Sequence, residues 1–133
     1  MSVRGVLIVE DDEGIRETLA ELFLDAGYAV LLAPNGQVAL DYLRQETAGW
    51  VVLVDLMMPV MDGYAFLQVV ATDRLLATQH AYILMSATIK TVPLAVADLL
   101  RRLHLSSLSK PFDLEEALGA VEKAAHRLPQ DAS

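Results

Sequence analysis

Carboxylates stand directly after two apolar runs of this 133-residue chain. Asp55 closes the run 50–54, and the cluster 10–12 (Glu-Asp-Asp) closes the run 6–9. A short run that is almost wholly apolar is typical of a strand buried on both faces, as in a parallel sheet covered by helices. The residue after such a strand lies at the carboxyl edge of the sheet, where open α/β folds bind ligands. The sequence therefore predicts a cation site and charge chemistry at this edge.

Two more polar side chains follow later apolar runs, Ser86 after the fourth and Lys110 after the fifth. Carboxylate oxygens are hard ligands that suit Mg²⁺ or Mn²⁺. A hydroxyl and an ammonium group beside such an ion neutralise the oxygens of a phosphoryl group. An aspartate can itself act as the nucleophile and form an aspartyl-phosphate. We therefore interpret the set as a site for phosphoryl transfer onto Asp55, with the metal ion, Ser86 and Lys110 stabilising charge.

The elements that must position these residues alternate along the chain, an apolar run followed by an amphipathic segment, five times. The strands are expected at 6–9, 29–33, 51–54, 82–85 and 105–108. The helices are expected from 13 to about 26 (ended by Gly27), from 35 or 36, from 64 to about 71 (capped by Asp62), from 92–93, and after 112 (capped by Asp113, with Glu116 three residues on). This alternation predicts one α/β domain over residues 1–126, a parallel sheet with helices on both faces, and a disordered tail over 127–133.

Composition excludes several other functions. A hydrophobic fraction of 54% with 21% charged residues is typical of a folded globular chain. The net charge of −8 argues against nucleic acid as a partner, and the absence of cysteine excludes disulfides, thiolate catalysis and cysteine-based zinc sites. No apolar run approaches the roughly 20 residues of a membrane span, and no segment resembles a signal peptide, so we expect a cytoplasmic protein. The histidines show no ligand spacing and are expected at the surface or at an edge: His80, His104 and His126.

Four motifs together resemble the receiver domain of two-component response regulators. They are Val-Glu-Asp-Asp at 9–12, Val-Asp-Leu-Met-Met-Pro at 54–59 with Asp-Gly at 62–63, Met-Ser-Ala at 85–87, and Ser-Lys-Pro-Phe at 109–112. Each motif alone is weakly specific, but their combination and order are highly specific and cover nearly the whole chain. The resemblance implies a flavodoxin-like fold of five parallel strands with five helices on both faces in three layers. It also implies a phosphoryl group taken from a histidine kinase or a small phosphodonor, and a conformational change at the face of the fourth helix, fifth strand and fifth helix.

The resemblance also implies a metal site. Asp55 would be the phosphoacceptor and a metal ligand, and Asp11 would be the other direct carboxylate ligand. Glu10 would hold the ion through a water molecule, and Met57 would bind it through its backbone carbonyl. The implied ion is Mg²⁺ or Mn²⁺.

On the phosphoryl side, the resemblance implies that Ser86 is the switch hydroxyl, that the backbone of Ala87 contacts the phosphoryl group, and that Lys110 binds it as a cation. The Lys110–Pro111 peptide would be cis.

Two positions depart from the family pattern. Ser107 stands where many receivers carry a switch tyrosine or phenylalanine, and a serine has no ring to move between exposed and buried states. We interpret Ser107 as an inert strand residue or a degenerate switch. The segment 99–104 lacks the Gly-Ala turn often found there. Met57 flanks the expected path of the hydrolytic water and cannot orient that water, so we predict a long-lived phosphoryl group.

The sequence leaves three classes of function open. The leading interpretation is a phosphorylation switch, which is no enzyme beyond its own phosphorylation and dephosphorylation. A phosphatase of the haloacid-dehalogenase type would need a second aspartate two residues after the nucleophile, where Met57 stands. A degenerate receiver would be an interaction module without phospho-switching.

The implied partners are proteins, with no membrane contact. One is a sensor histidine kinase or phosphotransfer protein, and Ile15 and Leu19 are expected to contribute to its docking as well as to the core. The other is a downstream protein or effector domain. Leu94 and Ala97 leave the buried face of the fourth predicted helix and form an apolar patch that could serve either a homodimer or a downstream partner.

Overall fold

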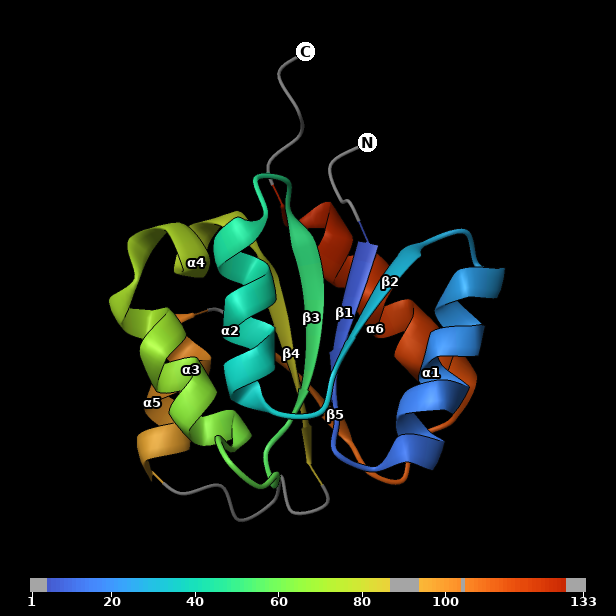
Figure 1. Cartoon of the computed structure of the whole chain (residues 1–133), viewed down its shortest axis with the longest axis horizontal. Coiled ribbons are helices and arrows are strands. Elements are labelled where there is room, and N and C mark those ends of the chain that lie inside the picture. The colour runs from blue at the N-terminus through green and yellow to red at the C-terminus, as the bar shows by residue number, and fades with distance from the viewer. Residues whose placement is uncertain (1–4, 87–93, 104, 129–133) are drawn as a thin grey trace.

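The computed structural model describes residues 5–86, 94–103 and 105–128, in which one parallel sheet lies between two layers of helices (Figure 1). The strands are β1 (Gly5–Val9), β2 (Ala29–Ala33), β3 (Trp50–Asp55), β4 (Ala81–Ser86) and β5 (Ser106–Ser109). Their order in the sheet is β2-β1-β3-β4-β5, with every neighbouring pair parallel. This is the doubly wound, flavodoxin-like order, and it confirms the predicted fold class.

All five predicted helices are present, together with a short one that the sequence analysis missed. The helices are α1 (Glu13–Asp25), α2 (Gly36–Gln45), α3 (Gly63–Thr72), α4 (Arg74–Gln79), α5 (Leu94–Arg102) and α6 (Leu114–His126). The unpredicted helix is α4, whose N-cap Asp73 accepts hydrogen bonds from the N–H groups of Leu75 and Leu76. The predicted start of the fourth helix at 92–93 lies outside the described residues. Among the described helices, none has the length and apolar character needed to cross a membrane.

The two faces of the sheet carry separate cores. Val52 and Val54 point to the core under α2, α3 and α5, whereas Val51 and Leu53 point to the core under α1 and α6. All four are fully buried, which explains why the third strand is apolar without alternation. Because side chains of a strand alternate between faces, Asp55 belongs to the α1 and α6 side of the sheet.

The helix starts are fixed by short polar side chains. In α1, α2, α3, α4 and α6, an aspartate or asparagine at the N-cap accepts a backbone N–H of the first turn. The predicted caps Asp62 and Asp113 are confirmed, the latter in a capping box with Glu116. Such a cap contributes about 1 kcal/mol. Gly27, with φ of +95°, ends α1 as predicted.

Packing continues past the predicted domain boundary at residue 126. Arg127 is the C-cap of α6, and Leu128 is 6% exposed and belongs to the core under α1 and α6. Residues 127 and 128 are therefore part of the packed domain and not of a disordered tail. Residues 129–133 lie outside the described residues.

The prediction of a surface position is wrong for His80. Its imidazole is 3% exposed, its Nδ1 accepts the backbone N–H of Trp50 at 2.9 Å, and its ring packs edge-on to Tyr82 at 6.5 Å. Burial lowers the pKa of His80 to about 4, against a smaller opposing effect of Glu46. His80 is thus a neutral core residue beside the start of β3. His126 is exposed as predicted, and His104 lies outside the described residues.

Candidate functional site

The strand register brings the predicted site residues to one edge of the sheet. Val9 of β1 pairs with Val54 of β3, so Glu10 and Asp55, which follow them, lie at the same level. Asp55 in turn pairs with Met85 of β4. β5 reaches the same edge, because Ser109 pairs with Ser86, and Lys110 follows directly.

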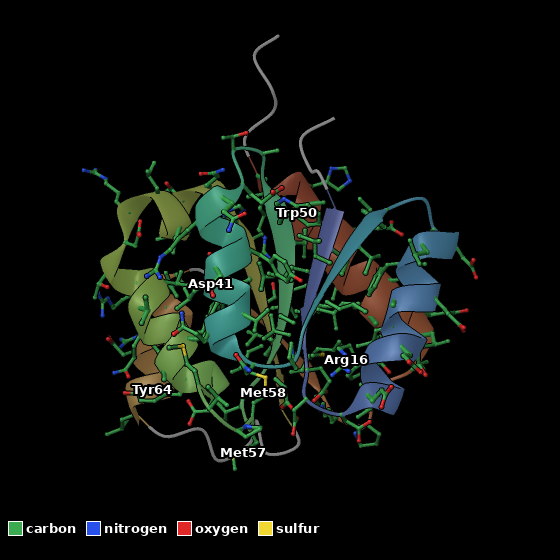
Figure 2. All side chains as sticks on the ribbon, viewed as in Figure 1. Arg16, Asp41, Trp50, Met57, Met58 and Tyr64 are labelled. Carbon is green, nitrogen blue, oxygen red and sulfur yellow. The ribbon has the colours of Figure 1, made fainter. Side chains whose placement is uncertain are left out.

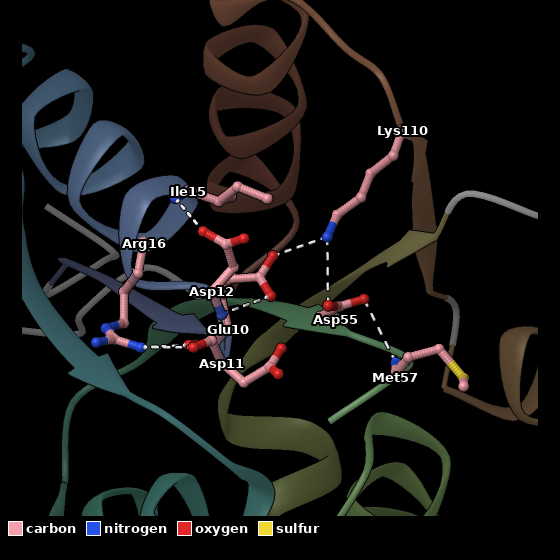
Figure 3. Close-up of polar contacts among 8 residues, drawn as sticks. All are labelled: Glu10, Asp11, Asp12, Ile15, Arg16, Asp55, Met57 and Lys110. Atoms are coloured by element: carbon pink, nitrogen blue, oxygen red, sulfur yellow. Dashed lines mark hydrogen bonds and ion pairs between the residues drawn. The ribbon is translucent and has the colours of Figure 1, made fainter. Parts of the chain in front are cut away.

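Three carboxylates converge at this edge (Figure 3). Oxygen atoms of Glu10, Asp11 and Asp55 lie within 4.8 Å of one another. Glu10 and Asp55 are 1% and 7% exposed, whereas Asp11 is open to solvent. A divalent ion with hard oxygen ligands fits this donor set, and the exposed side leaves room for the water ligands that Mg²⁺ retains. Asp12 is not part of the cluster, since it caps α1 by accepting the Ile15 N–H at 3.0 Å.

Lys110 lies across the same cluster. Its Nζ is 2.8 Å from Glu10 Oε1 and 3.2 Å from Asp55 Oδ2. Burial raises the pKa of Glu10 to about 7; the nearby Asp55 acts in the same direction and Lys110 opposes it. For Lys110, burial lowers the pKa, but the hydrogen bond to Glu10 and the charges of both carboxylates outweigh burial and raise it. Lys110 is therefore a firmly protonated cation beside Asp55.

The loop after β3 holds Asp55 through backbone contacts. Leu56 N–H donates to the Met85 carbonyl at 3.2 Å, and Gly63 N–H donates to the Leu56 carbonyl at 2.9 Å. A Cβ at Gly63 would collide with the Asp55 carbonyl oxygen and would lie 2.8 Å from Leu56 Cα. Glycine is therefore required where α3 begins against the end of β3.

Met57 lies at the mouth of the site. Its N–H is 3.4 Å from Asp55 Oδ1, a long hydrogen bond, and the residue is 75% exposed. Figure 2 shows Met57 at the same end of the sheet as Met58 and at the opposite end from Trp50.

Arg16 is a positioning residue that the sequence analysis missed. Its Nη1 donates to the carbonyl oxygens of Glu10 at 2.8 Å and Asp11 at 3.4 Å. These bonds tie the first turns of α1 to the acidic loop. No spacing rule would have found it, because the contact is to backbone oxygens.

The remaining predicted residues are placed only in part. The backbone of Ser86 ends β4, but its side chain, like Ala87, lies outside what the structure describes. Ser107 lies in β5 with its side chain exposed. The Lys110–Pro111 peptide is cis, as predicted.

The sheet order, with acidic residues directly after β1 and at the end of β3 and a lysine directly after β5, is the arrangement of a signalling receiver domain. The chain belongs to the response regulator receiver domain family, which matches residues 6–122. Domains of this family have phosphotransfer chemistry only, and they bind Mg²⁺ at an acidic pocket. Response regulators receive phosphate from histidine kinases and act on downstream effectors.

Similar proteins agree with this assignment. The chain is 33% identical over 118 residues to sporulation initiation phosphotransferase F of Bacillus subtilis (strain 168), covering 89% of this chain and 90% of that protein. It is 36% identical over 134 residues to response regulator MprA of Mycobacterium bovis, covering 100% of this chain but only 55% of the relative. The chain thus spans about half the length of that regulator and 25% of the regulatory protein AtoC of Escherichia coli.

Solved structures show the same fold. Chemotaxis protein CheY4 of Vibrio cholerae superposes with a TM-score of 0.77 at 26% identity, covering 92% of this chain and 98% of that one. The signal receiver domain of a signal transduction histidine kinase from Syntrophus aciditrophicus has a TM-score of 0.79 at 26% identity, covering 97% and 96%.

Proposed function

We propose that this chain is a phosphoacceptor domain whose acceptor is Asp55. The observation that carries the proposal is the surroundings of this carboxylate: it is 7% exposed, with Lys110 Nζ at 3.2 Å and with oxygens of Glu10 and Asp11 within 4.8 Å. A nucleophilic carboxylate, a cation and an oxygen donor set at one point are what phosphoryl transfer needs.

The proposed metal ligands are Asp11 and Asp55 directly, Glu10 through water, and the backbone carbonyl of Met57. When bound, Mg²⁺ (or Mn²⁺) supplies positive charge that offsets the negative oxygens of the incoming phosphoryl group. Arg16 keeps the acidic loop in place from α1. The all-oxygen donor set supports this proposal.

The proposed reaction begins with a phosphoryl donor, either a phosphohistidine of a sensor histidine kinase or phosphotransfer protein, or a small phosphodonor. An Asp55 carboxylate oxygen attacks phosphorus and forms the new P–O bond. In the kinase case the P–N bond breaks, its electron pair stays on the imidazole nitrogen, and the proton on the other ring nitrogen of the phosphohistidine leaves the released ring neutral. With an acyl phosphate as the small donor, the P–O bond to the acyl group breaks and its electron pair leaves with the carboxylate. Lys110, the Ser86 hydroxyl and the Ala87 backbone bind the phosphoryl oxygens.

The proposed output is a conformational change at the face of α5, β5 and α6, read by a downstream protein or effector domain. Leu94, 90% exposed at the start of α5, keeps a homodimer through this region open to test. Ser107 supports the second candidate function, a degenerate receiver that binds partners without switching, because β5 offers an exposed hydroxyl where a ring would move. A cytoplasmic location stays an expectation from the sequence.

The experiment is phosphorylation by acetyl phosphate with Mg²⁺, followed by intact mass. We expect one added phosphoryl group on the wild-type chain and none on Asp55→Asn or with a chelator. Addition to Asp55→Asn would contradict the assignment of the acceptor. Amide NMR spectra before and after phosphorylation separate the two candidates: shifts across α5, β5 and α6 support the switch, and shifts confined to the site support the degenerate receiver.

A further inference from the structure

β2 is an open edge of the sheet. It pairs with β1 on one side, and no described residue pairs with its other side. Figure 1 shows β2 between α1 and α2, with no further described element beyond it. The register with β1 runs without interruption from Ala29 to Ala33, so no bulge turns the edge away from a neighbour. An edge strand of this kind offers its free backbone groups to another strand.

The outward backbone groups of β2 belong to Val30 and Leu32. The Ala33 carbonyl accepts the Glu10 N–H at 3.0 Å, so the polar groups of Ala33 point toward β1. Backbone groups alternate in direction along a strand, so those of Leu31 also point toward β1, whereas those of Val30 and Leu32 point outward. Each of these two residues therefore offers one N–H and one carbonyl group at the open edge.

The side chains along this edge are apolar on both faces of the sheet. Val30 packs against the core under α1 and α6, and Leu31 packs against the core under α2, α3 and α5. Leu32 lies on the same face as Val30, because side chains alternate along a strand, and it is 37% exposed. A second strand beside β2 would therefore cover apolar surface as well as backbone groups.

α1 extends the apolar edge. Ile15 lies on the side of α1 near α6, because it lines one cavity together with Leu114. Leu24 is nine residues further along, which is half a turn away around the helix, so it lies on the side turned away from α6. Its side chain is 57% exposed. Ala20, one turn earlier, is small enough to let another helix come close.

No charge guards this edge. Residues 26–40 include all of β2 and both flanking loops, and they contain no Asp, Glu, Lys or Arg. No proline lies within the strand, although charged residues and proline are the usual protection of an edge. The net charge of −8 opposes contact between copies over the surface as a whole, but two β2 edges can meet without like charges in contact. A charged partner segment would find no opposite charge on the strand.

We propose that this edge binds a second copy of the chain, with the two β2 strands antiparallel about a two-fold axis at Leu31. In this register Val30 lies opposite Leu32 of the second copy, so the outward N–H and carbonyl groups of both residues are all paired. The cross-strand neighbours are apolar throughout, Val30 with Leu32 and Leu31 with its own copy. The contact closes as a dimer, because the same edge is used by both copies.

The flanking helices fit this arrangement. α1 and α2 each contact both β1 and β2, so each helix lies over that pair of strands. Because neighbouring strands are about 4.8 Å apart, the α1 helices of the two copies would lie about 10 Å apart across the axis, the ordinary distance between packed helices. A strand alone falls short of the roughly 800 Å² per partner of a stable dimer. Ala20 and Leu24 of α1 add to the shared surface.

Sedimentation velocity of the full chain tests the association. We expect a monomer–dimer equilibrium between micromolar and millimolar concentration that strengthens as salt is added, because salt screens the net negative charge. Leu32→Lys and Leu24→Lys should each raise the dimer dissociation constant at least about tenfold, because each puts a charge into an apolar contact. Leu94→Lys makes the same change at an exposed leucine of α5 and should leave the constant unchanged. A monomer at every concentration, or dissociation by Leu94→Lys instead, would overturn the proposal.

Cysteine cross-linking tests the register. The chain has no cysteine, so a single introduced thiol pairs only with its own copy. Leu31→Cys should form a disulfide-linked dimer with diamide, because opposed residues of a non-hydrogen-bonded pair have Cα atoms about 4.5 Å apart. Val30→Cys should link poorly with itself but well with Leu32→Cys in a mixture. Failure of Leu31→Cys to link, or efficient linking of Val30→Cys with itself, contradicts the antiparallel pairing.

Amide hydrogen exchange tests the backbone pairing. In the monomer the N–H groups of Val30 and Leu32 point outward, whereas that of Leu31 points toward β1. Raising the concentration should therefore slow exchange at Val30 and Leu32 and leave Leu31 unchanged. Exchange at Val30 and Leu32 that stays the same while the chain dimerises would place the interface elsewhere and overturn the proposal.

Phosphorylation by acetyl phosphate separates this inference from the proposed function. Antiparallel pairing puts the two Asp55 edges at opposite ends of the joined sheet, so Leu24→Lys should be phosphorylated at the wild-type rate. A chain that dimerises through β2 but is never phosphorylated contradicts the proposed function and leaves the dimer standing. A chain that is phosphorylated but stays monomeric contradicts the dimer alone.

Discussion

Lys110 and Glu10 are joined by an ion pair of 2.8 Å although one hundred residues separate them in the chain. The pair connects the end of the last strand to the end of the first, across the edge of the sheet that carries Asp55. Because Lys110 also faces Asp55, one side chain offsets two of the three clustered carboxylates.

Removing this cation should separate metal binding from phosphoryl transfer. In Lys110→Gln, the carboxylates lose the charge that competes with Mg²⁺, so Mg²⁺ should bind about tenfold more tightly. Phosphorylation by acetyl phosphate should be slower by at least about tenfold, because the positive charge that stabilises the oxygens of the transferring group is lost. Calorimetry and timed intact mass measure the two effects. Lys110→Arg, which keeps the charge, is the control for Mg²⁺ affinity, and weaker Mg²⁺ binding by Lys110→Gln would contradict this account.

The lifetime of the phosphoryl group should depend on Met57. This apolar side chain is 75% exposed at the mouth of the site, where it cannot orient a water molecule. Met57→Gln adds an amide that can, as glutamine does in other phosphoryl-transfer sites, so dephosphorylation should be roughly tenfold faster. Met57→Leu should keep the wild-type lifetime. A wild-type half-life of seconds would contradict the prediction of a long-lived phosphoryl group.

Gly63 and Gly119 should respond to alanine in opposite directions. At Gly63 a methyl group meets the Asp55 carbonyl and Leu56 Cα, so Gly63→Ala should lower the free energy of unfolding by about 2 kcal/mol or more. At Gly119, inside α6, a methyl group meets nothing within 4 Å. Because alanine has a better helix propensity than glycine, Gly119→Ala should raise the free energy of unfolding by about 0.5–1 kcal/mol. Urea denaturation of both variants gives the comparison. The same sign for both would contradict the close approach at Gly63.

Val60 stores backbone strain in the loop after β3. Its φ is +70°, and the flanking Met61 N–H donates to the Pro59 carbonyl at 2.8 Å, which makes a γ-turn with a β-branched residue at its centre. The side chain is 85% exposed, so little packing is lost on replacement. Val60→Asn should raise the free energy of unfolding by about 1 kcal/mol, since asparagine tolerates positive φ. Val60→Ala is the control, with a smaller change, and a destabilised Val60→Asn would argue against strain.

His80 should make stability fall in mild acid. Its pKa is about 4 in the folded chain against an ordinary value of 6.5, so the unfolded chain binds a proton first. The stabilisation is complete above pH 6.5 and is lost as the pH falls toward 4. At pH 5 the free energy of unfolding should be lower by about 2 kcal/mol than at neutral pH. His80→Asn keeps an acceptor for the Trp50 N–H without titrating. Urea denaturation at pH 7 and pH 5 should show a smaller loss for His80→Asn, and equal losses would rule out His80 as the source.

The main site residues could be predicted from sequence because strand ends fix them. Asp55 is the last residue of β3, whereas Glu10 and Lys110 directly follow β1 and β5. The parallel register brings these three strand ends to one edge of the sheet. These positions depend on where each strand ends along the chain, and the apolar runs in the sequence indicate those ends.

The parts that could not be predicted depend on contacts between distant segments. Arg16 reaches carbonyl oxygens, which no sequence pattern marks. The burial of His80 depends on an N–H thirty residues away at Trp50. The helix α4, six residues long, is too short to display a helical period, although Asp73 before it is a capping signal that could have indicated its start.

Trp50 and Asp55 occupy the two ends of β3, about 16 Å apart along the strand. The chain has one tryptophan, so all of its indole emission comes from the end of the sheet away from the carboxylate cluster. That emission will follow unfolding, since the ring is 4% exposed and bonded to Glu46 at 2.7 Å. The emission should change little when ions or phosphoryl groups bind at Asp55. A fluorescence titration with Mg²⁺ that shows no change therefore carries no information about occupancy of the site.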